Sequence, residues 1–331
     1  MFVLLRDWHK TIINIFSILL NMSNTTLASR EAYYGCSALI VKNDIVCDCS
    51  AGGFTNVPAE CPRNTTHFIL DYNNFTVLKP YSFIETPELR IISLRFCNIS
   101  KLDNYTFHGL HDLRNLSINN NKIKEIPIAI FNTIQNLQHL DLDNNEITLF
   151  PHVQISMLTK LHFLAVGGQF HRIHIGDGIK QLKQLETFWL SAAAMDTIYN
   201  DTFANLEKLP IKRFILRGQF SKLDKDAFKN LNSVTDITVS GYSIQLSEVI
   251  GAFHTFKDRY FESVDLSYNY KIGPTIILNN SLSTLWNMCI KKLSLRDNSI
   301  VQNYSTLYLP CSKETDKPTK ATYGRYEQVY I

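Results

Sequence analysis

Residues 113–131, LRNLSINNNKIKEIPIAIF, contain the spacing that recurs along most of this chain. Leu116, Ile118, Asn121 and Ile123 follow the pattern L-x-L-x-x-N-x-L. Its first element, two apolar residues separated by one other residue, occurs at ten places. The second residue of each pair is Leu70, Leu94, Ile118, Leu142, Val166, Leu190, Leu216, Val239, Leu266 and Leu295. The first five intervals are 24 residues each and the next four are 26, 23, 27 and 29, so we predict ten structural repeats.

A further apolar position predicts the opposite wall of each repeat. It follows the pair by 12 or 13 residues in seven repeats, at Phe83, Phe107, Phe131, Ile155, Ile179, Phe203 and Phe228. A single repeat of this size cannot cover its own apolar side chains, so stability must come from stacking on its neighbours. The pattern is that of a leucine-rich repeat. It predicts an α/β solenoid of horseshoe shape, with a concave parallel β-sheet and a convex side of short helices, 3-10 turns and loops.

The asparagine of the pattern has a predicted structural role where the chain leaves each strand. Its amide can satisfy buried backbone groups of the adjacent repeat. In the second repeat Cys97 takes this place, as a small residue that tolerates burial. The position is held by Asn73, Asn121, Asn145, Asn269 and Asn298, and is replaced by Gln169, Ala193, Gln219 and Tyr242. These replacements either mark a binding surface that departs from the regular arc or are tolerated drift.

Composition and charge exclude several classes of protein. The chain has 331 residues, of which 45% are hydrophobic and 19% are charged, and its formal net charge is +3. No run of lysine and arginine forms the stripe expected of a nucleic-acid-binding protein. The sequence has no phosphate-binding glycine loop, no nucleophile elbow and no H-E-x-x-H zinc motif. We therefore predict that the chain is not an enzyme and has no cofactor and no metal site.

Five histidines within two repeats are the one group that suggests chemistry. They are His139, His152, His162, His171 and His174, and the repeat spacing is expected to bring His139 close to His162. Such a group can bind a metal, or can gain charge between pH 5 and 7 and so sense acidification. The alternative interpretation is that these are solvated surface side chains.

The N-terminal residues predict secretion. Residues 1–28 combine Arg6 and Lys10, a short apolar run at 12–20, and the small-residue stretch 26–28, which is the layout of a cleaved signal peptide. An uncleaved signal anchor is the alternative, although the apolar run is short for a membrane span. No later stretch is long and apolar enough to anchor the C-terminus, so we expect a secreted or extracellular protein. N-x-S/T acceptors after residue 28 agree with this location, at Asn64, Asn74, Asn98, Asn104, Asn115, Asn200, Asn279 and Asn303.

Four of the seven cysteines cluster in residues 36–66, before the first repeat. They are Cys36, Cys47, Cys49 and Cys61. A zinc site is the rival interpretation, but the C-x-C spacing lacks the second C-x-x-C arm of recognisable zinc sites. Disulfides formed in an oxidising compartment fit better. Four cysteines allow three pairings, and spacing alone does not choose among them.

The C-terminal part of the chain lacks a comparable cluster. The repeats extend over residues 67–310, and residues 311–331 form a polar tail without a cysteine-rich C-terminal cap. Cys289 and Cys311 are candidates for a single closing disulfide.

On a concave sheet, the residues that flank each buried pair face outward and are available to a ligand. Trp189 lies between Phe188 and Leu190, so it is expected to point away from the core. Arg213 and Arg217, one repeat later, are expected to lie beside it. Tryptophan and arginine often dominate the energetics of interfaces. We predict ligand contacts at Trp189, Arg213, Arg217, Phe163 and Arg95; the alternative is a Trp189 shielded by a neighbouring loop or glycan.

Residues 36–66, CSALIVKNDIVCDCSAGGFTNVPAECPRNTT, resemble the cysteine-rich cap of extracellular leucine-rich-repeat proteins. This resemblance implies disulfides between Cys36 and Cys49 and between Cys47 and Cys61. The signal, the cap, the 24-residue repeats with their phenylalanines and the lengthened later repeats together resemble the N-terminal part of an invertebrate Toll-like receptor ectodomain.

The Toll-like resemblance implies an extracellular recognition module of innate immunity. Such a module binds a protein or microbial ligand, pairs in a receptor dimer or with a co-receptor, and exists as a receptor fragment or a soluble decoy. Two alternatives stay open, namely a matrix or cell-adhesion protein and a protein regulator or inhibitor. They share the same repeat architecture, because fold does not determine function.

Overall fold

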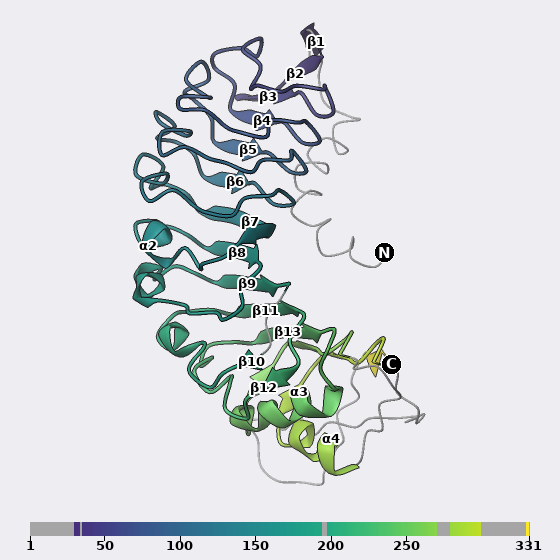
Figure 1. The fold of residues 1–331 in the computed structure, drawn as a ribbon. Helices are drawn as coiled ribbons and strands as arrows, with labels where there is room; N and C mark the ends of the chain where they lie inside the picture. The colour runs from purple at the N-terminus through teal and green to yellow at the C-terminus, as the bar shows by residue number, and fades with distance from the viewer. Residues whose placement is uncertain (1–29, 34, 194–196, 270–278, 299–328, 331) are drawn as a thin grey trace.

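The ten predicted repeats stack in chain order and build one long sheet (Figure 1). The computed structural model describes residues 30–33, 35–193, 197–269, 279–298 and 329–330. The sheet contains β1 (Arg30–Tyr33), β2 (Cys36–Val41), β3 (Asp44–Asp48), β4 (His67–Ile69), β5 (Ile91–Ser93), β6 (Asn115–Ser117), β7 (His139–Ile147), β8 (Phe163–Gly168), β9 (Thr187–Ala192), β11 (Arg213–Gly218), β13 (Asp236–Gly241), β15 (Ser263–Asp265), β17 (Leu293–Ser294) and β18 (Val329–Tyr330). The strands β1 to β3 pair antiparallel, and every pair from β3 onward is parallel. The predicted leucine-rich-repeat solenoid is confirmed.

Short helices and turns connect the strands. Figure 1 shows α2 on the outer side of the curve and α3 and α4 near its C-terminal end. The helical segments are α2 (His152–Ile155), α3 (Leu246–Ala252), α4 (Asn279–Trp286) and the 3-10 helices η2 (Asp177–Gln181), η3 (Ala204–Leu206) and η4 (Phe253–Phe256). Two further small parallel sheets pair β10 (Thr197–Ile198) with β12 (Lys222–Leu223), and β14 (Tyr260–Phe261) with β16 (Cys289–Ile290).

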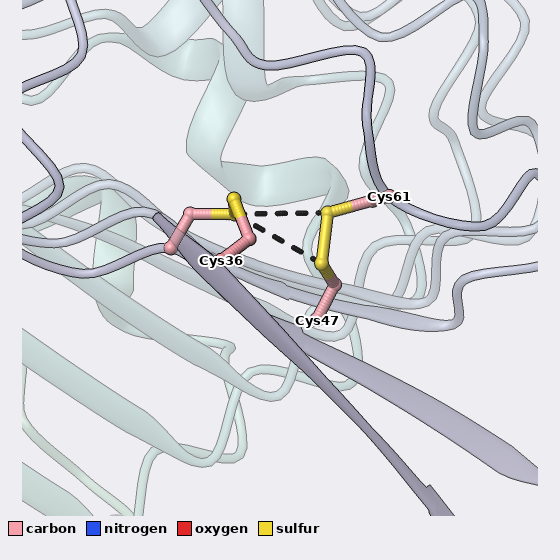
Figure 2. A group of neighbouring side chains, drawn as sticks. Cys36, Cys47 and Cys61 are labelled. Atoms are coloured by element: carbon pink, nitrogen blue, oxygen red, sulfur yellow. Dashed lines mark hydrogen bonds between the residues drawn. A yellow bond between two sulfur atoms is a disulfide. The ribbon is translucent and has the colours of Figure 1, made fainter. Parts of the chain in front are cut away.

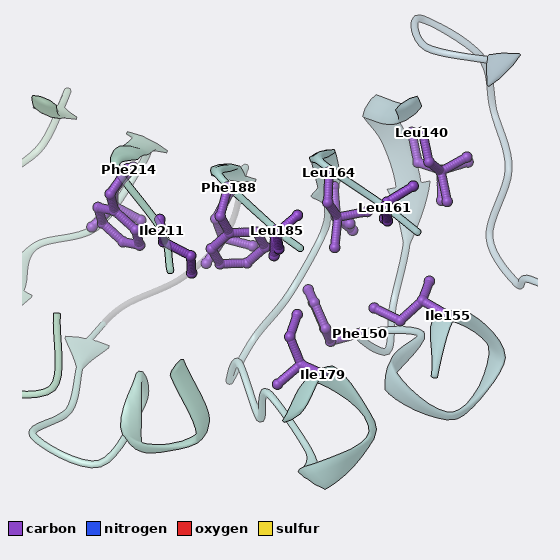
Figure 3. Close-up of a cluster of buried hydrophobic side chains, with 14 of the residues drawn as sticks. Leu140, Phe150, Ile155, Leu161, Leu164, Ile179, Leu185, Phe188, Ile211 and Phe214 are labelled. Carbon is purple, nitrogen blue, oxygen red and sulfur yellow. The ribbon is translucent and has the colours of Figure 1, made fainter. Parts of the chain in front are cut away.

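The apolar pairs of all ten repeats form one continuous core. Strand register places Leu164 opposite Leu140 on one side and Phe188 on the other, and the same alignment continues along the sheet (Figure 3). The seven predicted residues of the opposite wall are all buried. Among them, Phe83 stacks on Phe107 with ring centroids 5.6 Å apart. Each repeat therefore buries its apolar side chains against the next one, as the spacing predicted.

The asparagine ladder is confirmed in atomic detail. The Asn121 amide nitrogen donates to the carbonyl of Leu94 in the preceding repeat at 2.8 Å and to that of Ile118 at 2.9 Å. Its Oδ1 accepts the backbone N–H groups of Cys97 and Ile99, both at 3.0 Å. Asn73, Asn145, Asn269 and Asn298 make equivalent bonds to both neighbouring carbonyls. Four buried backbone groups are thus satisfied by one side chain.

Cys97 performs part of the same role with its thiol. Its Sγ donates to the carbonyl of Leu70 at 3.1 Å, the acceptor that an asparagine would use. The side chain is fully buried and the cysteine is free. Cys97 therefore keeps the hydrogen bond to the Leu70 carbonyl. It has no side-chain oxygen to accept backbone N–H groups of the preceding repeat, as Oδ1 of Asn121 does.

Four successive strands whose repeats lack the ladder asparagine, β8, β9, β11 and β13, have six residues each, whereas β4, β5 and β6 have three. β7 keeps Asn145 and has nine residues, with a register shift between Leu142 and Ile147. The extra residues pair in register, with Ala192 opposite Gly168 on one side and Gly218 on the other. A Cβ on Gly218 would lie 1.9 Å from the Ala192 oxygen, so this close pairing requires glycine there. Backbone pairing replaces the asparagine in these repeats.

The N-terminal cap carries two disulfides, Cys36–Cys49 and Cys47–Cys61 (Figure 2). All four cysteines are buried. Strand β3 of the cap pairs with β4 of the first repeat, so the cap covers the first core layer and continues the sheet. The pairing is the one that the family resemblance implied.

Several sequence-based predictions concern residues outside the described ranges. The signal-peptide prediction for residues 1–28, Cys311 and Asn303 all lie there. Cys289 is disulfide-bonded. In the polar tail, Val329–Tyr330 forms β18 and pairs with β17. Among the described residues, no helix has the length and apolar character needed to cross a lipid bilayer.

Candidate ligand-binding face

The flanking residues of each buried pair lie on the sheet face opposite the core. In β9 the buried residues alternate with half-buried ones, and Trp189 is one of the latter. Its neighbours in register are Ala165 of β8 and Ile215 of β11. The small Ala165 lies directly opposite Trp189 in β8. Trp189 therefore stands on the strand face away from the Phe188 and Leu190 side chains, as predicted.

Trp189 and Arg217 form a preorganised pair on this face. The Arg217 guanidinium carbon lies 4.8 Å from the centre of the indole ring, within the range of a cation–π contact. On the other edge of the ring, Nε1 of Trp189 donates to the Ser191 hydroxyl at 2.8 Å. The indole is thus fixed by a charge over its face and a hydrogen bond at its edge. The pair is therefore an ordered aromatic and cationic surface.

Arg213 lies elsewhere on the same strand. It is exposed at the start of β11, in register with Thr187 and Asp236, whereas Trp189 is in register with Ile215. Arg213 and Arg217 each lie two register positions from Ile215, on opposite sides of it. The cation–π contact joins Trp189 to Arg217. Ligand contact at Arg213 stays a prediction.

Arg95 is engaged within the chain. Its Nε donates to Asp71 Oδ2 at 2.8 Å, and its backbone N–H donates to Asp71 Oδ1, also at 2.8 Å. The Ser93 hydroxyl donates to the same carboxylate at 2.7 Å. The Asp71 side chain is only 3% exposed. Arg95 therefore compensates a buried charge, and a ligand would contact only its exposed part.

Phe163 and His139 form a third cluster on the sheet face. Their rings stack with centroids 4.0 Å apart and an interplanar angle of 5°. Burial lowers the pKa of His139 to about 4. The imidazole is therefore neutral between pH 5 and 7, so His139 is not the proposed acidification sensor. Of the other four histidines, His162, His171 and His174 are exposed, as the solvated interpretation holds, and His152 is half-buried.

An acidic pair, Asp141 and Asp143, lies on β7. Burial, followed by the charge of Asp143, raises the pKa of Asp141 to about 7. Burial also raises the pKa of Asp143, while the Ser191 hydroxyl and the charge of Arg217 act in the opposite direction. A Cβ on Gly167 would lie 2.3 Å from Asp143 Oδ1, so the glycine makes room for this carboxylate. In the sequence, this pair is visible as the spacing D-L-D at residues 141–143, on a strand that was predicted to line the concave face.

The acidic pair and the tryptophan pair are therefore linked across four strands. Asp143 on β7 extends over Gly167 of β8 toward Ser191 of β9, and Arg217 of β11 covers Trp189. We call this set the β7–β11 network. It combines negative charge, a hydroxyl, an aromatic ring and positive charge, which suits a polar ligand surface with an aromatic anchor.

The cap cysteines are the only group of potential metal ligands that the described ranges bring together. Their sulfur atoms all lie within 4.8 Å of one another. They form two disulfides, so no thiolate of this group is available to a metal ion.

The predicted glycosylation acceptors occupy different surfaces. Asn115 is half-buried in β6, in register with Ile91 and His139, so a glycan there would extend over the ligand face. The exposed acceptors lie in connecting segments, at Asn64, Asn74, Asn98, Asn104 and Asn200. These five acceptors therefore lie outside the strands of the large sheet.

Comparison with protein families agrees with the repeat architecture. Residues 72–301 match the model of a family described as a leucine-rich repeat region, and this span is well over half of the chain. The chain belongs to the leucine-rich-repeat family. No curated protein matches it closely enough to count as a relative. Leucine-rich-repeat domains are typically protein-interaction modules rather than enzymes, so the family supports a protein-binding role.

Proposed function

We propose that this leucine-rich-repeat protein is an extracellular recognition module, related to Toll-like receptors, that binds a protein or microbial ligand on its concave face. The observation that carries the proposal is the β7–β11 network, in which Trp189 and Arg217 are held ready for contact on the open face of the sheet. Tryptophan and arginine are the residue types that most often supply binding energy at the centre of interfaces.

The cap supports the extracellular part of the proposal. Two disulfides in one small segment are characteristic of oxidising compartments and rare in the cytosol. The predicted signal at residues 1–28 and the N-x-S/T acceptors are consistent with the same location. The module acts in innate immune recognition as a receptor fragment, a soluble decoy or a partner in a receptor dimer.

The concave face offers one distinctive surface for recognition. Its strands β8 to β13 lack the ladder asparagine, and their longer pairing makes a continuous platform around Trp189. A matrix or adhesion protein would use the same scaffold for a cell-surface partner, and a regulator would use it for a single protein target.

The test is a binding screen of the secreted, disulfide-bonded chain. The immobilised protein is exposed to purified microbial cell-wall fractions and to extracellular protein from the same source, and retained material is identified by mass spectrometry. We expect retention of a microbial product or of one secreted protein, and its loss in an Arg217→Ala variant. Retention of collagen or adhesion proteins alone would favour the matrix alternative. Binding that Arg217→Ala leaves unchanged would contradict the concave site.

A further inference from the structure

Two of the predicted glycosylation acceptors share a feature that the others lack. Asn74 and Asn98 each have an aromatic residue two positions before them, Tyr72 and Phe96. At the same position, the other acceptors after residue 28 have Pro62, Leu102, Leu113, Ile198, Ile277 and Val301. The two aromatic acceptor sites lie 24 residues apart, in successive repeats, so their local arrangement is repeated along the solenoid.

The aromatic residues form a stacked pair that faces solvent. The ring centroids of Tyr72 and Phe96 are 5.0 Å apart, and the ring planes differ by 3°. Tyr72 is 60% exposed and Phe96 is 45% exposed. Next to them, the Nδ2 atom of Asn98 donates to Oδ1 of Asn74 at 3.3 Å. The aromatic residues of the two sites thus stack on each other, and the two acceptor asparagines are hydrogen-bonded to each other.

The backbone under the aromatic pair makes these residue types unexpected. Tyr72 and Phe96 have φ of 60° and 55°, in the left-handed region. Asparagine holds the same position in the next two repeats, at Asn120 and Asn144, and asparagine adopts this conformation far more readily than bulky residues. Tyr268 also has an aromatic ring at this position, but it is partly buried and bonds to Asp297. The exposed pair therefore calls for a different explanation.

We propose that Tyr72 and Phe96 are a platform for N-linked glycans carried by Asn74 and Asn98. The Cα atoms two positions apart are separated by at most about 7 Å, so the first sugar on each asparagine is within reach of the rings. The ring faces carry the negative part of the aromatic quadrupole, which attracts the weakly positive C–H groups on one face of N-acetylglucosamine. The platform rests on the proposed extracellular location, since the glycans are added during secretion.

The chemistry of the modification is compatible with the contact between the acceptors. Transfer joins asparagine Nδ2 to C1 of the sugar, and the diphosphate-linked lipid carrier and one amide proton leave. One N–H remains on each Nδ2. The glycosylated Asn98 therefore keeps a donor for Asn74 Oδ1, so both sites can be occupied together. The glycans then cover an aromatic surface that would otherwise be open to nonspecific association.

The experiment compares two substitutions with and without glycans. The full chain is secreted from a eukaryotic cell, and glycopeptide mass spectrometry gives the occupancy of Asn64, Asn74 and Asn98. Thermal midpoints are then measured for Tyr72→Asn and Phe96→Asn, each in the glycosylated protein and in an Asn74→Gln/Asn98→Gln background. We expect each aromatic substitution to lower the midpoint by about 2 °C in the glycosylated protein. Without the two glycans it should leave the midpoint unchanged or raise it, because asparagine suits the left-handed backbone.

Asn64→Gln is the matched control, because that acceptor has Pro62 in place of the aromatic residue. It should leave the effects of Tyr72→Asn and Phe96→Asn unaltered. Equal effects in both backgrounds would overturn the platform. Occupancy of Asn64 with bare Asn74 and Asn98 would also overturn it, while keeping the extracellular function. If no acceptor is glycosylated in the secreting cell, the extracellular function fails as well.

Discussion

Arg217 covers one face of the Trp189 ring at 4.8 Å, and the two residues come from neighbouring strands that lack the ladder asparagine. The contact explains why a half-buried tryptophan is tolerated on this sheet, because the arginine stem shields part of its surface. It also reduces the entropy that a ligand would have to remove on binding, since both side chains are already ordered.

The first prediction concerns this pair. Trp189→Ala should weaken binding of the ligand found in the screen by about 30-fold, which corresponds to roughly 2 kcal/mol for a central aromatic anchor. Isothermal titration calorimetry measures the change, and circular dichroism checks that the variant is folded. Trp286→Ala is the control, because Trp286 on α4 is 41% exposed but lies outside the large sheet. Equal affinity of wild type and Trp189→Ala would remove Trp189 from the site.

The second prediction concerns the buried ion pair of the first two repeats. Arg95→Ala should lower the free energy of unfolding by about 3 kcal/mol, because it leaves the carboxylate of Asp71 buried without its cation. Urea denaturation followed by circular dichroism measures this loss. The exposed pair of Lys212 and Glu186, 2.8 Å apart, is the comparison, and Lys212→Ala should cost far less, because water screens an exposed ion pair. Similar losses in both variants would contradict the structural role of Arg95.

The third prediction concerns the cysteine in the asparagine ladder. Cys97→Asn should raise the free energy of unfolding by about 1 kcal/mol, because an amide would restore the oxygen acceptor that the thiol lacks. Cys97→Ala should lower it, since the bond to the Leu70 carbonyl is lost. Urea denaturation distinguishes the two variants. A destabilised Cys97→Asn would show that the second repeat has adapted to the smaller side chain.

The same cysteine should be unreactive in the folded protein. Burial raises the pKa of the Cys97 thiol to about 11, so almost no thiolate forms at pH 8. We expect iodoacetamide to label Cys97 only after denaturation, as seen by mass spectrometry. Rapid labelling of the native protein would mean that this part of the core opens readily.

The repeat architecture was predictable because it depends on local spacing. Alternation within a strand places Leu116 and Ile118 on one face, and stacking at a constant interval follows from repetition. The ladder role of Asn121 was equally predictable, since its hydrogen-bonding groups match those left open at a strand end. These features need no knowledge of distant contacts.

The properties of individual site residues were less predictable, because they depend on contacts between side chains of different repeats. Arg95 was expected to face a ligand, and the spacing did not reveal that its guanidinium also pairs with Asp71 one repeat earlier. The desolvation of Asp141 depends on the atoms packed around β7, which spacing does not reveal. Similarly, the ring that contacts His139 is Phe163, the residue next to the expected His162.

The last prediction concerns two opposing titrations on β7. Asp141 has a folded-state pKa of about 7 against 3.8 for the ordinary group, so its contribution to stability falls as the pH rises through this window. His139 has a folded-state pKa of about 4 against 6.5, so its contribution falls as the pH decreases from 6.5 toward 4. The two slopes therefore oppose each other between pH 4 and 6.5.

Each single variant removes one of the two titrations, so its free energy of unfolding should follow the pH dependence of the other. Relative to the wild type, Asp141→Asn should lose stability on acidification from pH 6.5 to 4, because it keeps the neutral His139 but lacks one of the two carboxyl groups whose pKa burial raises. His139→Phe keeps the stack on Phe163 and should gain stability over the same range. Urea denaturation at several pH values measures both profiles, with the wild type as the reference. Parallel profiles for Asp141→Asn and His139→Phe would contradict the opposing titrations.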